Sequence, residues 1–308
     1  MNDSQIHVLP TPVRALLTDE PIDLLTFAAR SFNGGRVAIA TLVEIRGGAA
    51  RALGSHVIVL GDGRFAGYVS GGCVEAAVAA EALLAIADDC DRLVLFGEGS
   101  PFLDVVLPCG GGITVAIHVL RHVEEIEIAI ERLKQRQVAA LRYSPEQQSL
   151  VLAERTQRSG WVGDDFLTVY CPRTKVIVSG QTIEVRSVSR IAECSGFEVA
   201  VLAPDSGPRL IRAVADPFSA IVLLHHDLEQ EIPMLEAALQ TKCFYLGALG
   251  SRRTHRRRLD RLLRLGHSEI ELARIKAPIG LFGPARDSVS LALSVLADVA
   301  ASRSLESG

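Results

Sequence analysis

The sequence lacks the features that mark several classes of protein. None of its apolar stretches reaches the ~20 uninterrupted residues that a membrane span requires, although 48% of the residues are hydrophobic. The chain does not open with a basic segment followed by an apolar one, so we expect no secretory signal. A formal net charge of −4 gives no overall attraction to polyanions. We therefore expect a cytoplasmic protein with no membrane partner and no nucleic-acid partner.

Closely spaced cysteine pairs are also absent. The chain has 6 cysteines, none of them in a Cys-x-x-Cys pair, so a disulfide scaffold and a zinc ribbon are poor interpretations. Free thiols in a reducing cytoplasm mostly act as small buried hydrophobic groups. Only the residues around a given cysteine can therefore assign chemistry to it.

Length and periodicity indicate two domains in the 308 residues. The second half alternates predicted strands and helices, as expected of a doubly wound parallel sheet. The first half mixes predicted strands, a hairpin and an Ala-rich helix over 74–88. We predict an α/β fold with an α+β domain over 1–140, a polar linker over 141–173 and a Rossmann-like domain over 174–308.

The last predicted helix is amphipathic. Its apolar residues fall near a 3.6-residue repeat, so one face should pack on the sheet. The residues of this face are Val289, Leu293, Leu296, Val299 and Ala300.

The first candidate site is the segment Ser70-Gly71-Gly72-Cys73-Val74-Glu75. A thiol placed where glycines lead into a helix lies near unpaired backbone N–H groups and the positive end of the helix dipole, which favour the thiolate. Cys73 would then be a nucleophile or a soft metal ligand, the glycines would let a ligand approach, and Glu75 could accept a proton. Alternatively, the segment is a tight strand-to-helix connection with Cys73 in the core. Spacing alone leaves both interpretations open.

The second candidate site is Pro108-Cys109-Gly110-Gly111-Gly112. Successive glycines cost conformational entropy on folding, so they suggest close approach by another group, with a permissive β-turn as the alternative. Two glycine-flanked thiols in one domain could hold a soft metal or carry sulfur between them. We therefore treat Cys73 and Cys109 as candidate metal ligands.

The third candidate is the turn after the first strand of the second half, where a dinucleotide-binding fold has Gly-x-Gly-x-x-Gly. This chain has Gly180-Gln181-Thr182-Ile183-Glu184-Val185 and keeps only the first glycine. Thr182 and Val185 would block a pyrophosphate and tight helix packing. Asp205 follows a proline, so a ribose-binding acid is not in place. The pattern predicts that the fold is kept and that an ordinary NAD site is lost.

Two further segments of the second half carry polar groups that could bind or react. Ser251-Arg252-Arg253 opens a helix after a glycine-rich loop, where a phosphate or a pterin-type anion could bind. The arginines at 256–258 are interpreted as a solvated helix face. His225-His226-Asp227 could assist proton transfer, although capping of the next helix by Asp227 is favoured.

Four motifs follow one another along the chain: Val69-Ser70-Gly71-Gly72-Cys73-Val74-Glu75, Leu107-Pro108-Cys109-Gly110-Gly111, Leu246-Gly247-Ala248-Leu249-Gly250-Ser251-Arg252-Arg253, and Ala277-Pro278-Ile279-Gly280-Leu281 followed by Ala285-Arg286. In these motifs and in their order, the chain resembles the XdhC/CoxI family of xanthine dehydrogenase accessory proteins, from about Ala38 to Ala300. The chain departs from the family at Thr182, Ile183 and Ala203, where members usually keep a Gly-x-Gly-His type turn and an acidic residue.

The resemblance implies a chaperone that binds the molybdenum cofactor (molybdopterin), supports its sulfuration and delivers it to a molybdenum hydroxylase apoenzyme such as xanthine dehydrogenase. A cysteine desulfurase is then an expected partner, and we also expect a homodimer without turnover chemistry. Cys73 and Cys109 become the leading cofactor contacts. The further candidate contacts are Gly71, Gly72, Glu75, Gly110, Gly111, Ser251, Arg252 and Arg253.

Two other functions stay open at this point. The second domain could make the chain a nucleotide-dependent oxidoreductase or cofactor-modifying enzyme, although its missing glycines argue against this. The chain could also be a regulator that holds a hydroxylase without touching the cofactor.

Overall fold

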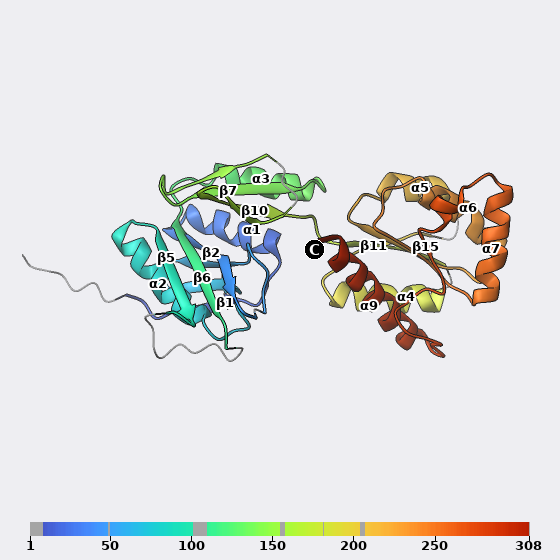
Figure 1. The fold of residues 1–308 in the computed structure, drawn as a ribbon, viewed down its shortest axis with the longest axis horizontal. Coiled ribbons are helices and arrows are strands. Elements are labelled where there is room, and N and C mark those ends of the chain that lie inside the picture. The colour runs from blue at the N-terminus through green and yellow to red at the C-terminus, as the bar shows by residue number, and fades with distance from the viewer. Residues whose placement is uncertain are drawn as a thin grey trace, which may run out of the picture. The chain divides into compact units, whose positions relative to one another are not determined.

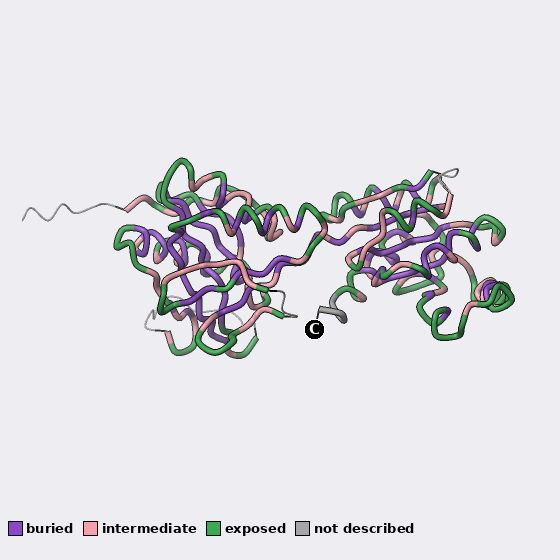
Figure 2. Tube along the Cα trace, turned by 90° about the horizontal axis from the view of Figure 1, so that it is seen from above, coloured by how far each residue is buried: buried purple, intermediate pink, exposed green. Residues whose placement is uncertain are grey.

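A computed structural model describes residues 9–48, 50–100, 110–154, 158–180, 182–203 and 207–307. The chain forms two compact units, Met1–Cys171 (unit 1) and Pro172–Gly308 (unit 2). In each unit the buried residues gather on the sheets and the exposed residues on the loops and outer helix faces (Figure 2).

Unit 1 is built on a six-stranded sheet with the order β1-β4-β3-β2-β6-β5. β1 runs parallel to β4, and the other neighbours are antiparallel. The strands are β1 (Val13–Leu16), β2 (Val37–Arg46), β3 (His56–Leu60), β4 (Arg64–Gly67), β5 (Arg92–Gly97) and β6 (Gly112–Val119). β3 and β6 are buried along their whole length, and β2 along its first seven residues, which requires cover on both faces of the sheet.

Helices and a second sheet supply that cover (Figure 1). The Ala-rich helix α2 (Glu75–Asp88) packs on one face of the six-stranded sheet. Helices α1 (Pro21–Phe32) and α3 (Glu124–Lys134) pack on the other face, together with residues of the second sheet. The Ala content of α2 lets this helix lie close to the sheet.

The second sheet of unit 1 occupies the segment that was expected to be a linker. Its order is β8-β7-β10-β9, from β7 (Ala139–Ser144), β8 (Ser149–Leu152), β9 (Gly160–Val162) and β10 (Asp165–Tyr170). Tyr143 and Phe166 pack against Val43 and Ala116 of the six-stranded sheet. The linker prediction over 141–173 is therefore wrong: polar residues dominate the composition, but short strands between the polar turns belong to the core.

Unit 2 is an all-parallel, five-stranded sheet with the order β12-β11-β13-β14-β15. Its strands are β11 (Lys175–Gly180), β12 (Glu198–Val201), β13 (Ser219–Leu224), β14 (Tyr245–Ala248) and β15 (Ile275–Lys276). Its helices are α4 (Thr182–Cys194), α5 (Gly207–Val214), α6 (Leu228–Leu239), α7 (Arg252–Arg264), α8 (Glu269–Leu272) and α9 (Ser288–Ser307). Helices α5, α6 and α7 cover one face, and α4 and α9 cover the other (Figure 1). The predicted doubly wound α/β fold is confirmed.

The buried face of α9 differs from the predicted one. Leu296 and Val299 are buried as expected, but Val289 and Leu293 are 53% and 51% exposed. Ala300, which was also expected on the buried face, is exposed. Ala292 and Val295 complete the buried face. With Leu296 and Val299 they keep the helical spacing of three and four residues, but this face begins at Ala292 instead of at Leu293. Two overlapping apolar stripes satisfy the repeat, and packing against α4 selects one of them. Among the described residues, no helix is long and apolar enough to cross a membrane.

Candidate functional site

The first glycine motif connects β4 to α2 and is held by a buried carboxylate. Glu75 is 1% exposed. Its carboxylate accepts hydrogen bonds from the backbone N–H groups of Val69 (3.1 Å) and Ser70 (2.8 Å) and from the Ser70 hydroxyl (3.0 Å). Glu75 therefore holds the start of the loop, Val69 and Ser70, from the buried side. A direct contact between Glu75 and a cofactor stays a prediction, and the observed bonds give it a structural role.

The glycines of this loop face open space. Among the described residues, a Cβ placed at Gly72 would meet nothing within 4 Å, but its φ of +109° favours glycine. At Gly71 the φ is ordinary, and of the residues that the structure describes a Cβ would meet only the Ala50 side chain, at 3.9 Å. Neither backbone conformation nor internal packing explains the glycine at 71. The exposed thiol of Cys73 follows directly, at the start of α2.

The second glycine motif is built differently. A Cβ at Gly111 would lie 2.4 Å from the Arg46 carbonyl oxygen, and one at Gly112 would lie 2.6 Å from that of Glu98. Close packing where β6 begins beside β2 therefore explains these two glycines. A Cβ built at Gly110, which has a φ of +71°, would meet none of the described residues within 4 Å. Cys109 lies outside the described residues.

The loop that follows β2 brings the two motifs to the same edge of unit 1. Gly47 lies against Gly111, whose Cα is 3.4 Å from a Cβ built at Gly47, and Ala50 lies against Gly71. Gly71 of the first motif and Gly111 of the second therefore both lie against residues that follow β2, namely Ala50 and Gly47. Coordination of a metal by Cys73 and Cys109 stays a prediction, and within the described residues no group of three His, Cys, Asp or Glu side chains could hold a metal ion.

Sequence reasoning missed a cluster beside this loop, made of Arg14, Arg51 and Tyr68. Arg51 donates from Nε to the Ser70 carbonyl oxygen (3.3 Å) and from Nη1 to Asp19 (2.5 Å). Both guanidinium groups lie over the Tyr68 ring. No sequence signal could have found the arginines, because they come from β1 and from the loop before β3 and belong to no motif.

A hollow of about 160 Å³ lies between α1, the loop before β3 and β10. Its wall includes His56 and Tyr170, whose Nε2 and hydroxyl oxygen are 2.7 Å apart. His56 Nδ1 lies 3.0 Å from the Thr41 hydroxyl. Burial lowers the pKa of His56 to about 4, so the imidazole is neutral at pH 7. Both ring nitrogens are occupied, so this polar chain joins the two sheets and leaves no nitrogen free for a ligand.

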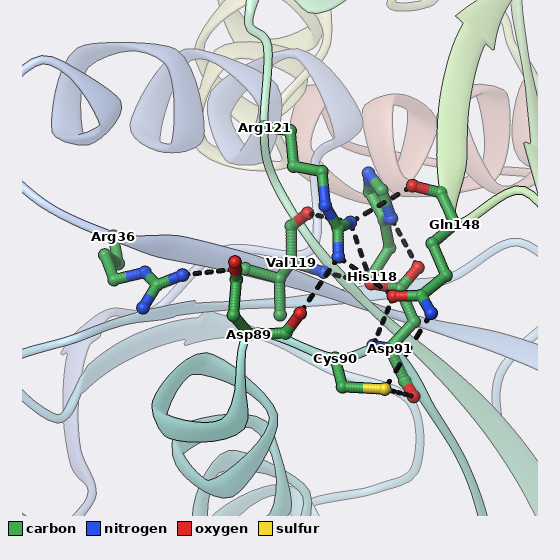
Figure 3. Close-up of polar contacts among 8 residues, drawn as sticks. All are labelled: Arg36, Asp89, Cys90, Asp91, His118, Val119, Arg121 and Gln148. Atoms are coloured by element: carbon green, nitrogen blue, oxygen red, sulfur yellow. Dashed lines mark hydrogen bonds and ion pairs between the residues drawn. The ribbon is translucent and has the colours of Figure 1, made fainter.

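A second buried polar network lies at the other end of β6, far along the strand from Gly112 (Figure 3). Asp91 accepts from His118 Nδ1 (2.6 Å) and from Arg121 (3.1 Å). Burial would raise the pKa of Asp91, but these hydrogen bonds outweigh it and hold the pKa below its usual value. Arg121 also donates to the Gln148 side chain (2.9 Å). The network therefore fastens the β7–β8 turn to the six-stranded sheet and belongs to the scaffold.

In unit 2 the single remaining glycine of the dinucleotide motif has an internal explanation. Gly180 has a φ of +142°, and a Cβ there would lie 2.3 Å from the backbone carbonyl carbon of Leu224. Beside it, the Ser179 hydroxyl lies 3.0 Å from His225 Nε2. Asp227 caps α6 by accepting a backbone hydrogen bond (3.0 Å), as predicted. Asp205 lies outside the described residues.

The predicted anion site of unit 2 is a capped helix start. Ser251 caps α7 by accepting from the Thr254 backbone N–H (3.2 Å), and Arg252 and Arg253 are exposed. Anion binding by these three residues stays a prediction. They belong to unit 2, whereas the other candidate contacts belong to unit 1.

The solvated helix face expected at 256–258 is wrong for Arg258. This side chain is fully buried and donates to both carboxylate oxygens of Glu231 (2.8 and 2.9 Å) and to the Leu249 carbonyl oxygen (2.7 Å). Burial raises the pKa of Glu231, opposed by the Arg258 guanidinium. The fork geometry of arginine makes such a buried pair possible. Arg258 therefore supports the turn that leads into α7.

Comparison with known proteins covers both units. Residues 33–97 match the model of the XdhC and CoxI family, and residues 176–299 match the XdhC Rossmann domain. The chain is 46% identical over 293 residues to the molybdenum cofactor insertion chaperone PaoD of Escherichia coli (strain K12), which covers 95% of this chain and 92% of that protein.

A solved structure shares the fold. The crystal structure of a xanthine dehydrogenase from Bacillus halodurans aligns with a TM-score of 0.73 at 18% identity, over 93% of this chain and 96% of that one. The first glycine motif and Ser251-Arg252-Arg253 both fall inside matched segments, whereas Cys109 falls between them. On this evidence the chain belongs to the XdhC and CoxI family, and its second unit is an XdhC Rossmann domain.

Proposed function

We propose that this chain binds the molybdenum cofactor and inserts it into a molybdenum enzyme, without catalysing a reaction of its own. The observation that carries the proposal is the 46% identity, over nearly the whole length of both chains, to a protein named as a molybdenum cofactor insertion chaperone. The cofactor is cargo in this function. The protein therefore needs a surface that holds it reversibly.

The loop from Ser70 to Cys73 suits such cargo. It offers an exposed sulfur, which is a soft ligand suited to a soft metal centre. It also offers the bare backbone of Gly71, which leaves room for a second molecule. Glu75 holds this backbone in place from the buried side, so little ordering is needed on binding.

The finer parts of the proposal concern the client and the sulfur. We propose a molybdenum hydroxylase such as xanthine dehydrogenase as the client, and a cysteine desulfurase as the source of sulfur for cofactor sulfuration. A homodimer is the proposed assembly. The support for all three is the family resemblance, and Cys73 and Cys109 are the residues proposed to touch the metal centre.

Cofactor retention tests the proposal. Purified protein mixed with molybdenum cofactor should co-elute with molybdenum and pterin on gel filtration, and Cys73→Ser or Cys109→Ser should reduce the amount retained. Cys194→Ser is the matched control, because Cys194 is an exposed thiol of unit 2. A wild-type protein that retains no cofactor would contradict the chaperone function. Equal retention by all variants would contradict only the role of the thiols.

A further inference from the structure

The cluster of Arg14, Arg51 and Tyr68 adjoins the loop that is proposed to hold the cofactor. We propose that it is a phosphate-binding subsite, in which the guanidinium groups of Arg14 and Arg51 hold a phosphate group of the cofactor. This inference rests on the proposed function. It places the phosphate contact in unit 1, apart from the exposed arginines at the start of α7.

Arg14 is the main evidence. Its guanidinium carbon lies 4.2 Å from the centroid of the Tyr68 ring and 4.8 Å from that of Phe65. One nitrogen, Nη1, donates to the Gly67 carbonyl oxygen (3.0 Å). In the part of the chain that the structure describes, no carboxylate forms an ion pair with Arg14. A half-buried cation stacked on aromatic rings without a counter-ion is suited to binding an anion.

Arg51 links this cation to the glycine loop. Its Nε donates to Ser70, the residue before Gly71, and its guanidinium carbon lies 5.2 Å from the Tyr68 ring centroid. Its ion pair with Asp19 is exposed, with 59% of the Asp19 side chain accessible. Exposed pairs of this kind contribute little stability. A phosphate, which carries more charge and accepts from the same fork of donors, can therefore compete with Asp19 for Arg51.

Arg46 shows what a structural arginine looks like at the same edge of the unit. Its Nη1 donates to Glu44 (2.7 Å) and to the Thr114 hydroxyl (2.8 Å), and its Nη2 donates to the Glu98 and Ile113 carbonyl oxygens. These partners account for both terminal nitrogens of Arg46. Arg14, by contrast, has a single such acceptor and two rings, which leaves donors to spare.

The alternative is that Arg14 only packs β1 against β4. Two arms of an experiment on the full chain separate the two possibilities: retention of molybdenum cofactor, and direct binding of inorganic pyrophosphate by calorimetry. Loss of one charge-assisted contact should weaken cofactor retention by Arg14→Gln about tenfold to hundredfold. Arg14→Lys should recover part of this loss, because it keeps the charge. Pyrophosphate should bind wild type and compete with the cofactor, but should not bind Arg14→Gln.

The matched control is Arg64→Gln. Arg64 lies on β4 near the cluster but pairs with Asp62 at the exposed hairpin turn (2.8 Å), so this variant should behave as wild type. Thermal unfolding of each variant checks that the fold is kept. Retention by Arg14→Gln equal to that of wild type, with no binding of pyrophosphate to either, would overturn the subsite and leave the proposed function intact. A different result is also informative: the wild-type protein binds pyrophosphate through Arg14 but retains no cofactor. This result would overturn the proposed function and leave the anion site intact.

Discussion

Gly71 in unit 1 and Gly180 in unit 2 each lie where a strand leads into a helix: Gly71 is in the loop between β4 and α2, and Gly180 is the last residue of β11, before α4. A Cβ at Gly180 would lie 2.3 Å from the backbone of Leu224, whereas a Cβ at Gly71 would meet, within the described part of the chain, only Ala50, at 3.9 Å. Internal packing therefore explains the glycine of unit 2 and not that of unit 1. The comparison supports the proposal that an incoming molecule approaches unit 1, although unit 2 has the fold better known for binding ligands.

Both units hold a glycine-containing turn with a buried charged side chain. Glu75 accepts three hydrogen bonds at the start of the turn in unit 1. Arg258 donates to Leu249 before the turn that opens α7 in unit 2 and is itself neutralised by Glu231. Each of these two turns is therefore held by the hydrogen bonds of a buried charged side chain.

The largest effect is expected from Arg258→Ala. Removing one partner of a buried ion pair leaves Glu231 buried without its counter-ion, which should lower the free energy of unfolding by about 3–5 kcal/mol. Urea unfolding measures this loss. Arg257→Ala is the control, because Arg257 is exposed on the same helix and should change stability by less than about 0.5 kcal/mol. Equal stability of the two variants would show that Arg258 does not support the turn.

The next largest effect is expected from Gly180→Ala, which should lower the free energy of unfolding by about 3 kcal/mol. The added methyl group must displace the backbone of β13, and the left-handed φ adds strain for a residue with a side chain. Hydrogen exchange should show faster opening of β11 and β13, with unit 1 unchanged. If Gly180→Ala is as stable as wild type, packing inside the protein does not require glycine at position 180. Gly180 and Gly71 would then not differ in this respect.

Acidification should weaken unit 1 more than unit 2. The pKa of His56 is lowered to about 4 from an ordinary 6.5, so the unfolded state takes up a proton first as the pH falls. The stability from His56 is complete above pH 6.5 and is lost between pH 6.5 and 4, by about 3 kcal/mol. His225 in unit 2 shifts in the same direction but is only partly buried. Fluorescence of Trp161, the single tryptophan, reports on unit 1.

His56→Gln provides the comparison for this pH dependence. The variant should be less stable at pH 7 but should lose less stability between pH 6.5 and 4 than wild type does. The same loss in both proteins would assign the acid sensitivity to other groups. Asp91 is one such group, but its lowered pKa acts below its ordinary value of 3.8 and so outside this range.

The sequence predicts correctly those parts of the fold that depend on residues close together in the chain. The alternation of strands and helices gave the parallel sheet of unit 2, because each element there carries its own periodicity. The strands β7 to β10 escaped prediction because their core positions are defined by distant partners such as Val43 and Ala116. The burial of Arg258 depends in the same way on Glu231, 27 residues earlier.

The residues of the candidate site show the same difference between local sequence and distant contacts. Cys73 and Gly71 belong to one continuous motif, and sequence reasoning selected both as candidates. It left open whether the thiol lies in the core, and the structure shows it exposed. Arg14 and Arg51 come from two other segments and meet Tyr68 only in the folded chain. A single sequence does not reveal such a meeting, because neither arginine lies within a recognisable motif.

The smallest expected effect on stability, and the sharpest test of the comparison, is that of Gly71→Ala. The ordinary φ and the open space predict a change in the free energy of unfolding below about 0.5 kcal/mol. If another molecule approaches this backbone, the added methyl group should nevertheless weaken cofactor retention at least about tenfold, equivalent to ~1.4 kcal/mol. Gly35→Ala is the control, because it too has open space and an ordinary φ but precedes β2 at the opposite end of that strand. A clearly destabilised Gly71→Ala would show that the protein itself requires glycine at this position. Unchanged cofactor retention would show that the cofactor does not approach the backbone of this loop.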